Sequence, residues 1–341
     1  MRTADFDYAL PPELIAQAPL PERDRSRLLV VDRAAGGLAH RTFADFAVIP
    51  APGDVVAIND SRVIPARLPA RRPGGGKAEV LLVHREETGL WRALVRPGSR
   101  IRVGTVLQLG DDDRAEIVGH LPGGERRLRL AGPGGPDAVL ARRGLVPLPP
   151  YIKRDPTALD AERYQTVYAA APGSVAAPTA GLHFTPAVLA RLAERGVALA
   201  RLTLHVGPGT FRPVTANDPA AHRLDPEWYV LPPEAAETIN GARARGGRVW
   251  AVGTTATRTL ESCADEDGVV RAGFGWTSLF IRPGHTFRVV DHLLTNFHLP
   301  KSTLLMLVSA FAGRELVMRA YEAAIRERYR FYSYGDAMLI V

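Results

Sequence analysis

Cysteine is nearly absent from this chain, whose 341 residues include only Cys263. A single thiol cannot form an internal disulfide, and it cannot build a metal centre from clustered thiolates. The chain also has no run of 18 apolar residues, which argues against a membrane-spanning helix. Its N-terminus carries acids and prolines in place of the basic start and apolar core of a signal peptide. These absences favour a cytoplasmic protein that does not enter a membrane.

Several sequence signatures of common enzyme classes are missing as well. No His-Glu-x-x-His is present, and "RPGGGKAE" lacks both the first glycine of a phosphate-binding loop and the Ser or Thr after Lys77. In "HVGPGTFR", Arg212 stands where a dinucleotide-binding loop has its third glycine. No Gly-x-Ser-x-Gly turn occurs. The chain therefore has none of the standard nucleotide-binding or hydrolase motifs.

Lysine is scarce, with only Lys77, Lys153 and Lys301, although the formal net charge is +7. Arginine therefore carries nearly all of the positive charge. A surface of this kind favours a polyanionic partner such as nucleic acid. A GC-rich coding sequence, which enriches arginine, alanine, glycine and proline, accounts for the same composition. Charge alone leaves both interpretations open.

The chain is about twice the length of an average domain, which predicts two domains. Between residues 70 and 149, short apolar runs are separated by Gly, Pro and Asp turns at intervals of roughly ten residues. This pattern predicts a small antiparallel β-barrel domain inserted into the chain. Its predicted strands are Glu79–His84, Trp91–Val95, Val106–Leu109, Glu116–Gly119 and Arg127–Leu130.

The remaining residues, 1–69 and 150–341, alternate predicted strands and helices, which is typical of a mixed α/β domain. We expect both ends of the chain to build this domain together. The predicted strands are Leu28–Asp32, Val55–Ile58, Ala198–His205, Arg248–Val252 and Ser278–Ile281. The predicted helices are Pro12–Ala16, Pro186–Arg195, Pro233–Arg245, Thr255–Ala264, Ser302–Ala312 and Arg314–Arg328.

Three histidines occur in similar company, in "TAGLHFTP" (His183), "LTLHVGPGTFRP" (His205) and "LLTNFHLPKSTL" (His298). Each follows apolar residues and precedes a proline at a predicted strand end or loop. Ligands of α/β proteins bind at strand carboxyl ends, where a histidine can transfer protons near neutral pH. Two alternatives stay open: hydrogen bonding within a turn, and convergence of the three loops on a metal, although the spacings match no short zinc motif.

Other polar residues follow predicted buried strands. Asn59 and Arg62 in "INDSRVIPAR" are site candidates or parts of a plain turn. In "AVGTTATRTLE", Thr254 or Thr255 is predicted to cap a helix whose free N–H groups can hold a carboxylate or phosphate, with Arg258 one turn further on. An ordinary capped helix is the alternative.

The segment "SVAAPTAGLHFTP", residues 174–186, places small residues and prolines just before a helix. Thr185 is predicted to cap the helix that Pro186 begins. The small residues allow either a tight buried turn or a close backbone approach to a bulky ligand.

These stretches, in this order, resemble one family. The resemblance is carried by "PERDRSRLL", "NDSRVIPARL", "LPPYI", "RYQTVYA", "GSVAAPTAGLHF", "TLHVGPGTF", "AVGTTATRTLE", "TNFHLPKSTLLMLVSAFAG" and "YRFYSYGDAML". Together they look like the S-adenosylmethionine:tRNA ribosyltransferase-isomerases of queuosine biosynthesis. The resemblance extends from about residue 4 to the C-terminus and is weakest over the predicted barrel.

The resemblance implies a tRNA-modifying transferase that uses S-adenosylmethionine as a co-substrate. The ribosyl group is transferred and isomerised onto the aminomethyl group of 7-aminomethyl-7-deazaguanine at the tRNA wobble position. Epoxyqueuosine-tRNA is formed, and adenine and methionine are released. The family is expected to be a cytoplasmic monomer that needs no metal, with an α/β catalytic domain and an inserted β-barrel.

The resemblance also implies roles for individual residues. His183 is the first candidate for proton transfer and His298 the second. One departure is Asp225 in "AHRLDPEWY", where family members tend to have a histidine, and this segment is therefore left out of the catalytic set. The predicted co-substrate contacts are Asn59, Arg62, Thr179, His205, Thr210, Thr254, Thr255 and Arg258. The predicted tRNA contacts are Arg67, Arg71, Arg72, Arg326, Arg328 and Arg330.

Two other functions stay open on the sequence. One is a non-catalytic tRNA-binding protein that reads RNA with its barrel. The other is a conventional methyltransferase dependent on S-adenosylmethionine, against which the missing glycine loop speaks.

Overall fold

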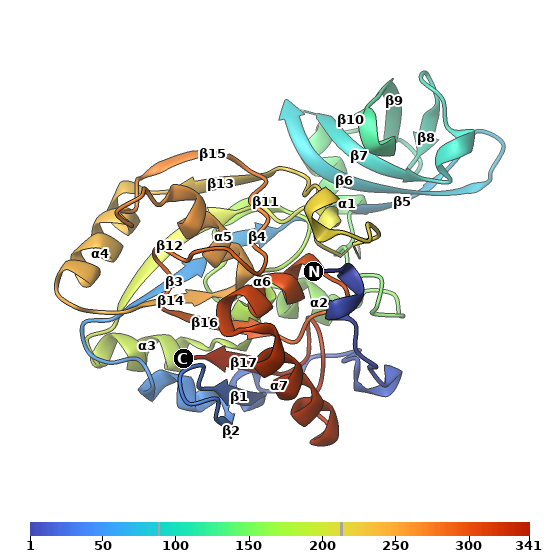
Figure 1. The fold of residues 1–341 in the computed structure, drawn as a ribbon. Coiled ribbons are helices and arrows are strands. Elements are labelled where there is room, and N and C mark those ends of the chain that lie inside the picture. The colour runs from blue at the N-terminus through green and yellow to red at the C-terminus, as the bar shows by residue number, and fades with distance from the viewer. Residues whose placement is uncertain (88, 212–213) are drawn as a thin grey trace.

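The computed structural model describes residues 1–87, 89–211 and 214–341. These residues form an α/β body around a nine-stranded sheet, with a closed six-stranded barrel on one side of it (Figure 1). The predicted fold class, a mixed α/β domain with a small antiparallel barrel, is confirmed.

The large sheet has the order β15-β13-β12-β3-β14-β16-β17-β1-β2. The neighbouring strands β12, β3, β14 and β16 pair in parallel, as do β1 and β17, and the other pairs are antiparallel. Strands from both chain ends are therefore neighbours in one sheet. The bounds are β1 Arg27–Val31, β2 Leu38–Thr42, β3 Val55–Asn59, β12 Ala198–Leu204, β13 Glu227–Leu231, β14 Val249–Val252, β15 Gly273–Thr277, β16 His292–Asn296 and β17 Ala337–Ile340.

Helices cover both faces of this sheet. Along β3, Val55 and Ala57 pack on one face with the apolar residues of α4 to α7, while Val56 and Ile58 pack on the other with α3. This alternation explains why β3 is apolar throughout, as in other strands buried on both faces. The helices are α2 Ala158–Arg163, α3 Pro186–Glu194, α4 Pro233–Ala244, α5 Gly253–Cys263, α6 Thr303–Ala312 and α7 Arg314–Arg326.

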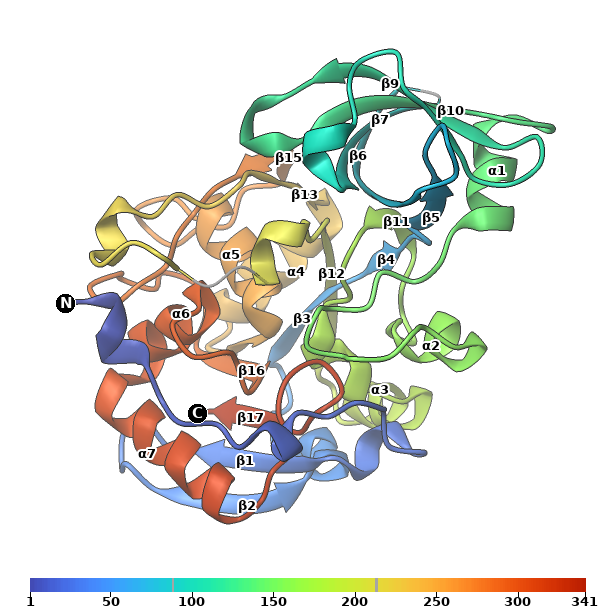
Figure 2. The ribbon, with the colours of Figure 1, turned by 90° about the vertical axis from the view of Figure 1, so that its right-hand side faces the viewer.

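The barrel has the order β10-β7-β6-β5-β8-β9 and its own apolar core. Each strand predicted between residues 70 and 149 lies in it, but β5 was missed because its sequence "RLPAR" contains a proline and two arginines. Its strands are β5 Arg67–Arg71, β6 Lys77–Glu87, β7 Leu90–Arg96, β8 Val106–Gln108, β9 Arg114–His120 and β10 Arg126–Ala131, with helix α1 Pro136–Arg143 packed beside them. Figure 2 looks into the barrel.

Short elements connect the two bodies. β4 Ser61–Val63 pairs in parallel with β11 Ala171–Ser174 between the large sheet and the barrel. Short 3-10 helices lie at Thr3–Phe6, Pro12–Leu14, Arg23–Arg25, Phe43–Val48, Gly98–Arg100, Pro122–Gly124, Thr179–His183, Pro208–Phe211 and Pro219–Ala221. None of the helices in the described residues has the length and apolar character needed to cross a membrane.

Two local predictions are wrong. The predicted strand Ser278–Ile281 is instead an unpaired segment, and the strand in this region is β15, which ends at Thr277. Leu279, Phe280 and Ile281 are apolar because they pack against the core, not because they pair in a sheet. The predicted helix at Pro12–Ala16 is only a 3-10 turn ending at Leu14.

Candidate active site

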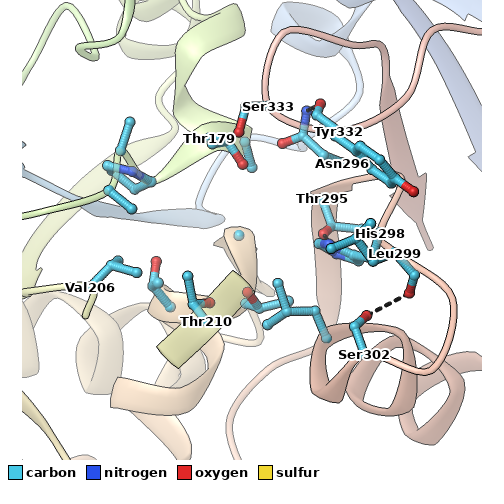
Figure 3. Close-up of a pocket in the computed structure, with 18 of the residues that line it drawn as sticks. Thr179, Val206, Thr210, Thr295, Asn296, His298, Leu299, Ser302, Tyr332 and Ser333 are labelled. Atoms are coloured by element: carbon cyan, nitrogen blue, oxygen red, sulfur yellow. Dashed lines mark hydrogen bonds between the residues drawn. The ribbon is translucent and has the colours of Figure 1, made fainter. Parts of the chain in front are cut away.

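A cavity lies at the carboxyl ends of the parallel strands β14 and β16, facing the 3-10 turn Thr179–His183. It contains about 670 Å³ of empty space, part of which is open to solvent. We call it the first cavity (Figure 3). It is lined by Tyr151, residues 176–180, Val206, Thr210, residues 253–255, residues 295–299, Ser302, Leu304, Tyr332 and Ser333.

His298 lies in the wall of the first cavity, two residues after β16 ends. Its Nε2 is 2.7 Å from Oγ1 of Thr295, which fixes the plane of the ring. Within the described part of the chain, Nδ1 has no hydrogen-bond partner. Burial lowers the pKa of His298 to about 3, so the ring is neutral at pH 7. The neutral imidazole can either accept or donate a proton through Nδ1, depending on its tautomer.

His183 does not line the first cavity. It borders a smaller depression beside Arg23 and Tyr334, and both of its ring nitrogens have partners. Nδ1 is 2.7 Å from Oγ of Ser26, and Nε2 is 3.2 Å from Nδ2 of Asn296. Burial lowers its pKa to about 3. The ring stacks on Phe43, 5.1 Å away, so the core holds it in place.

Helix α5 begins in the first cavity. Neither Thr254 nor Thr255 caps it, contrary to the prediction, because the helix already begins at Gly253, whose φ of +87° turns the chain out of β14. Thr254 and Thr255 both line the cavity instead. Oγ1 of Thr255 is buried and has no hydrogen-bond partner in the described residues. The first turn of α5 thus presents free N–H groups and an unpaired hydroxyl to the cavity.

The start of α3 follows the prediction. Oγ1 of Thr185 accepts a hydrogen bond of 3.2 Å from the Val188 amide, and Pro186 is the first helical residue. The glycine before this helix, Gly181, is required for packing, because a Cβ there would lie 2.1 Å from the Tyr168 hydroxyl oxygen.

A second cavity adjoins the first, and Thr210 and Leu304 line both. It contains about 950 Å³ of empty space between the large sheet and the barrel. His205 and Thr210 line it together, as predicted. The other lining residues are Val83, His84, Arg92, Glu125, Gly173, residues 207–209, residues 224–228, Arg258, Trp276, residues 279–281, Thr303 and Leu307.

His205 is held at this second cavity by two contacts. Its Nδ1 is 2.7 Å from Oγ of Ser61, and its ring lies against the backbone of Gly173. A Cβ at Gly173 would be 2.6 Å from Nε2 of His205, so only glycine permits this approach. Burial lowers the pKa of His205 to about 4. The three histidines therefore line three different cavities, of which the first and second adjoin, and they do not meet at one point.

Arg258 lines the second cavity but is already paired. Its guanidinium forms a buried ion pair with the Glu227 carboxylate, and its Nε donates to the Leu279 carbonyl oxygen at 2.9 Å. The other Glu227 oxygen accepts a hydrogen bond from the Gly207 amide. Arg258 thus ties α5 to β13, which reduces its availability for a ligand carboxylate.

Asn59 and Arg62 line neither cavity. Oδ1 of Asn59 accepts 3.0 Å hydrogen bonds from the Ser61 and Leu204 amides, and its Nδ2 donates to the Leu204 carbonyl oxygen. The side chain is fully buried and fastens the end of β3 to β12. Arg62 is exposed on β4.

Comparison with known proteins shows the family of the chain. A family model described as "Queuosine biosynthesis protein" matches residues 3–340. The chain belongs to this queuosine biosynthesis family. The resemblance noted in the sequence and the assignment as an enzyme of this family are thereby confirmed.

Relatives of this chain match it over its whole length. A protein of Moorella thermoacetica is 55% identical and one of Symbiobacterium thermophilum 54% identical, each covering 100% of both chains. Both are named S-adenosylmethionine:tRNA ribosyltransferase-isomerase. The crystal structure of an S-adenosylmethionine tRNA ribosyltransferase from Thermotoga maritima is 40% identical, with a TM-score of 0.57, and covers 99% of this chain and 100% of that one.

The arginines predicted to contact tRNA fall into two groups at opposite ends of the molecule. Arg67, Arg71 and Arg72 belong to β5 of the barrel or follow it, whereas Arg326, Arg328 and Arg330 lie at the end of α7 and just beyond (Figures 1 and 2). They do not form one continuous surface.

Some of these six arginines already have partners within the protein, and others are exposed. Arg67 is paired with Glu79 at 2.7 Å, and Arg330 donates to the Ala18 carbonyl oxygen. Arg71, Arg326 and Arg328 are exposed. Among the six, exposure therefore favours these three for contact with a polyanion.

Asn296 is the main site residue that the sequence analysis missed. It is the last residue of β16, is 2% exposed and lines the first cavity. It stands two residues before His298 in "TNFHLP", and only the histidine of this segment was predicted to lie in a site. The same treatment of strand-end polar residues that selected Asn59 would have found it.

Proposed function

We propose that this chain transfers and isomerises the ribosyl group of S-adenosylmethionine onto the aminomethyl group of 7-aminomethyl-7-deazaguanine at the wobble position of tRNA. The products are epoxyqueuosine-tRNA, adenine and methionine. Family membership and the names of full-length relatives support this reaction. Among structural observations, the strongest support is a buried, neutral His298 with a free Nδ1 in the wall of the first cavity.

We place S-adenosylmethionine in the first cavity. The lining matches its chemistry: Tyr151 and Tyr332 supply aromatic surface for a purine, and the first turn of α5 offers N–H groups to the methionine carboxylate. Unpaired polar atoms of Thr255 and Asn296 lie in this wall and need partners. Thr179, Thr254 and Thr210 border the same space.

The second cavity is the proposed place of the tRNA base. It opens beside the barrel and joins the first cavity at Thr210, so the two substrates would meet there. His205 and the carboxylate of Asp225 line it, and a carboxylate suits a cationic aminomethyl group. The Glu125 carboxylate in the same wall is already paired with Arg92 at 2.7 Å. The barrel would then guide the tRNA. We propose residues 70–149 as the inserted domain, which strand β5 enters from Arg67.

His298 is the proposed proton-transfer residue. A sulfonium group makes the neighbouring ribose 5′ hydrogens acidic, and removing one of them begins the rearrangement. Since His298 is neutral and oriented by Thr295, its Nδ1 can take a proton without first losing one. Direct proton transfer by His183 stays a prediction, but the geometry favours an indirect role because both of its ring nitrogens are occupied.

The tRNA is proposed to dock on the barrel side of the molecule. The second cavity is partly built from the barrel residues His84, Arg92 and Glu125. Arg71 is the exposed arginine of the adjoining strand β5. The resemblance also implies a cytoplasmic monomer that needs no metal, and these three points stay predictions.

One experiment separates this function from its alternatives. The protein is incubated with S-adenosylmethionine, labelled in adenine and in the methyl group, and with tRNA carrying 7-aminomethyl-7-deazaguanine. The proposed reaction releases adenine and labelled methionine and leaves no methyl label on the tRNA. A methyltransferase would label the tRNA, and a non-catalytic tRNA-binding protein would release nothing.

A further inference from the structure

The side-chain amide of Asn296 can be oriented without ambiguity. Its Nδ2 is 3.2 Å from the Tyr332 carbonyl oxygen and 3.4 Å from the Asp336 carbonyl oxygen. Carbonyl oxygens only accept hydrogen bonds, so the NH₂ end must face them. Exchanging the two ends of the amide would bring Oδ1 against two other oxygens. The NH₂ group therefore points into the protein, and Oδ1 points the other way.

This orientation also determines the tautomer of His183. Since Nδ2 of Asn296 is a donor, Nε2 of His183, at 3.2 Å, must accept. The ring proton is then on Nδ1 and is donated to Oγ of Ser26 at 2.7 Å. The Ser26 hydroxyl in turn donates to the Arg23 carbonyl oxygen at 3.2 Å. In this series of hydrogen bonds each donor has an acceptor, and the series ends at the side-chain amide of Asn296.

Oδ1 of Asn296 takes no part in these hydrogen bonds. It is buried and has no hydrogen-bond partner among the described residues. Buried amide oxygens in folded proteins nearly always have a partner, and an unpaired one marks a place for water, an ion or a ligand. Asn296 lines the first cavity, which is the space beside it that can supply a partner.

The surroundings narrow the chemistry of that partner. Tyr151 and Tyr332 line the same cavity, with their ring centroids 4.7 Å apart, and Phe297 and Ala177 add apolar surface. A flat, largely apolar ligand with an N–H group at its edge suits an aromatic wall beside one amide oxygen. The exocyclic amino group of a purine has this chemistry.

We infer that Oδ1 of Asn296 accepts a hydrogen bond from the 6-amino group of the adenine of S-adenosylmethionine, and that His183 is the residue that positions it. This inference rests on the proposed function for the identity of the co-substrate. It assigns to Asn296 the discrimination between adenine and purines with a keto oxygen at position 6. His183 acts only through Asn296 and does not touch the substrate.

The test compares S-adenosylmethionine with S-inosylmethionine, in which a keto oxygen replaces the 6-amino group. Binding of each to the full chain is measured by calorimetry, without tRNA and without turnover. Wild-type protein is expected to bind the inosyl compound about tenfold or more weakly, since a neutral hydrogen bond is lost and two acceptors meet. Equal affinity for the two compounds would overturn the inference, and this comparison needs no variant.

Variants then locate the discrimination. In Asn296→Leu, which removes the acceptor, the two compounds should bind with affinities within about threefold of each other. In His183→Leu the preference should shrink because Asn296 is no longer held, whereas His183→Gln keeps an acceptor for Nδ2 and should restore it. A variant that keeps the full wild-type preference without Asn296 would exclude this residue. If His183→Gln prefers S-adenosylmethionine as little as His183→Leu does, His183 does not position Asn296.

Analogues separate the amino group from another donor on the same co-substrate. The ribose hydroxyls also carry O–H donors. If the 2′-deoxy or 3′-deoxy compound, and not the inosyl compound, loses affinity only in protein that retains Asn296, the inference about adenine is wrong. Failure of the proposed function is recognised separately, as absence of adenine release from wild-type protein with tRNA, and it leaves the binding comparison intact.

Discussion

Oγ1 of Thr295 lies 2.7 Å from Nε2 of His298, three residues further along the chain. The threonine is the penultimate residue of β16, so the strand itself fixes the hydroxyl that orients the ring. The main chain of His298 is held as well, because its amide donates to the Tyr321 hydroxyl at 2.8 Å and its carbonyl oxygen accepts from the Tyr8 hydroxyl. The ring is therefore fixed against the cavity before any substrate binds.

Replacing His298 should remove the proposed proton transfer. His298→Ala is expected to lower the rate of adenine release about 10²-fold or more, the usual size of an acid–base contribution. Thr295→Val should lower this rate by a smaller factor, because the His298 ring stays in place but loses the hydroxyl that orients it. Single-turnover release of labelled adenine in the presence of tRNA measures both. His120→Ala is the matched control, since His120 is exposed on β9. A wild-type rate in His298→Ala would contradict the assignment.

The free energy of unfolding should decrease as the pH falls below about 6.5, the pKa of histidine in an unfolded chain. Burial lowers the pKa of both His183 and His298 to about 3, compared with about 6.5 in an unfolded chain. The unfolded state therefore binds more protons between pH 6.5 and 3, and the stability present above pH 6.5 is lost as pH falls.

Thermal unfolding midpoints measured from pH 7 to pH 4 test this dependence. His183→Gln should flatten the curve, because one buried titrating group is removed. His120→Gln, at an exposed position, should leave the slope unchanged. An identical slope in wild type and His183→Gln would mean that His183 titrates normally in the folded protein.

Removing one partner of the buried ion pair between Arg258 and Glu227 should strongly destabilise the protein. Both side chains are 8% exposed. Arg258→Met leaves a buried carboxylate without its partner, which costs about 3–5 kcal/mol, and Glu227→Gln should cost a comparable amount. The double variant should be less destabilised than the sum of the two. Urea unfolding of the three variants gives these values.

The same variants decide between two roles of Arg258. If the arginine instead held the methionine carboxylate, Arg258→Met would weaken binding of S-adenosylmethionine while leaving stability near that of wild type. Calorimetric titration of the folded variants separates the two outcomes.

Affinity for tRNA should fall steeply with salt, because each phosphate contact releases counterions. Arg71→Gln should reduce the slope of log K against log salt by up to about one, whereas Arg326→Gln at the opposite end should leave it unchanged. The two residues form a matched pair, since both are exposed arginines. A larger effect of Arg326→Gln, or a flat salt dependence, would place the tRNA elsewhere.

Local features of this protein were predictable from the sequence because they depend on residues close together in the chain. In the barrel, short apolar runs lie between turn-forming residues, and each strand predicted from them is found in the structure. Thr185 and Pro186 specify the start of α3, where the Thr185 hydroxyl accepts a hydrogen bond from the amide of Val188, three residues further along the chain. The family resemblance depends on the same kind of contiguous segment.

The tertiary structure alone decided which of the candidate residues reach a cavity. Asn59 and Asn296 both end buried strands in similar sequence contexts, yet Asn59 fastens two strands together and Asn296 lines the first cavity. Arg258 meets Glu227 from 31 residues away, and His183 meets Asn296 from 113. Such pairings arise from the order of strands in the sheet, and no spacing along the chain encodes that order. The sequence therefore determined which segments build the site, and the packing of distant segments decided the role of each side chain within it.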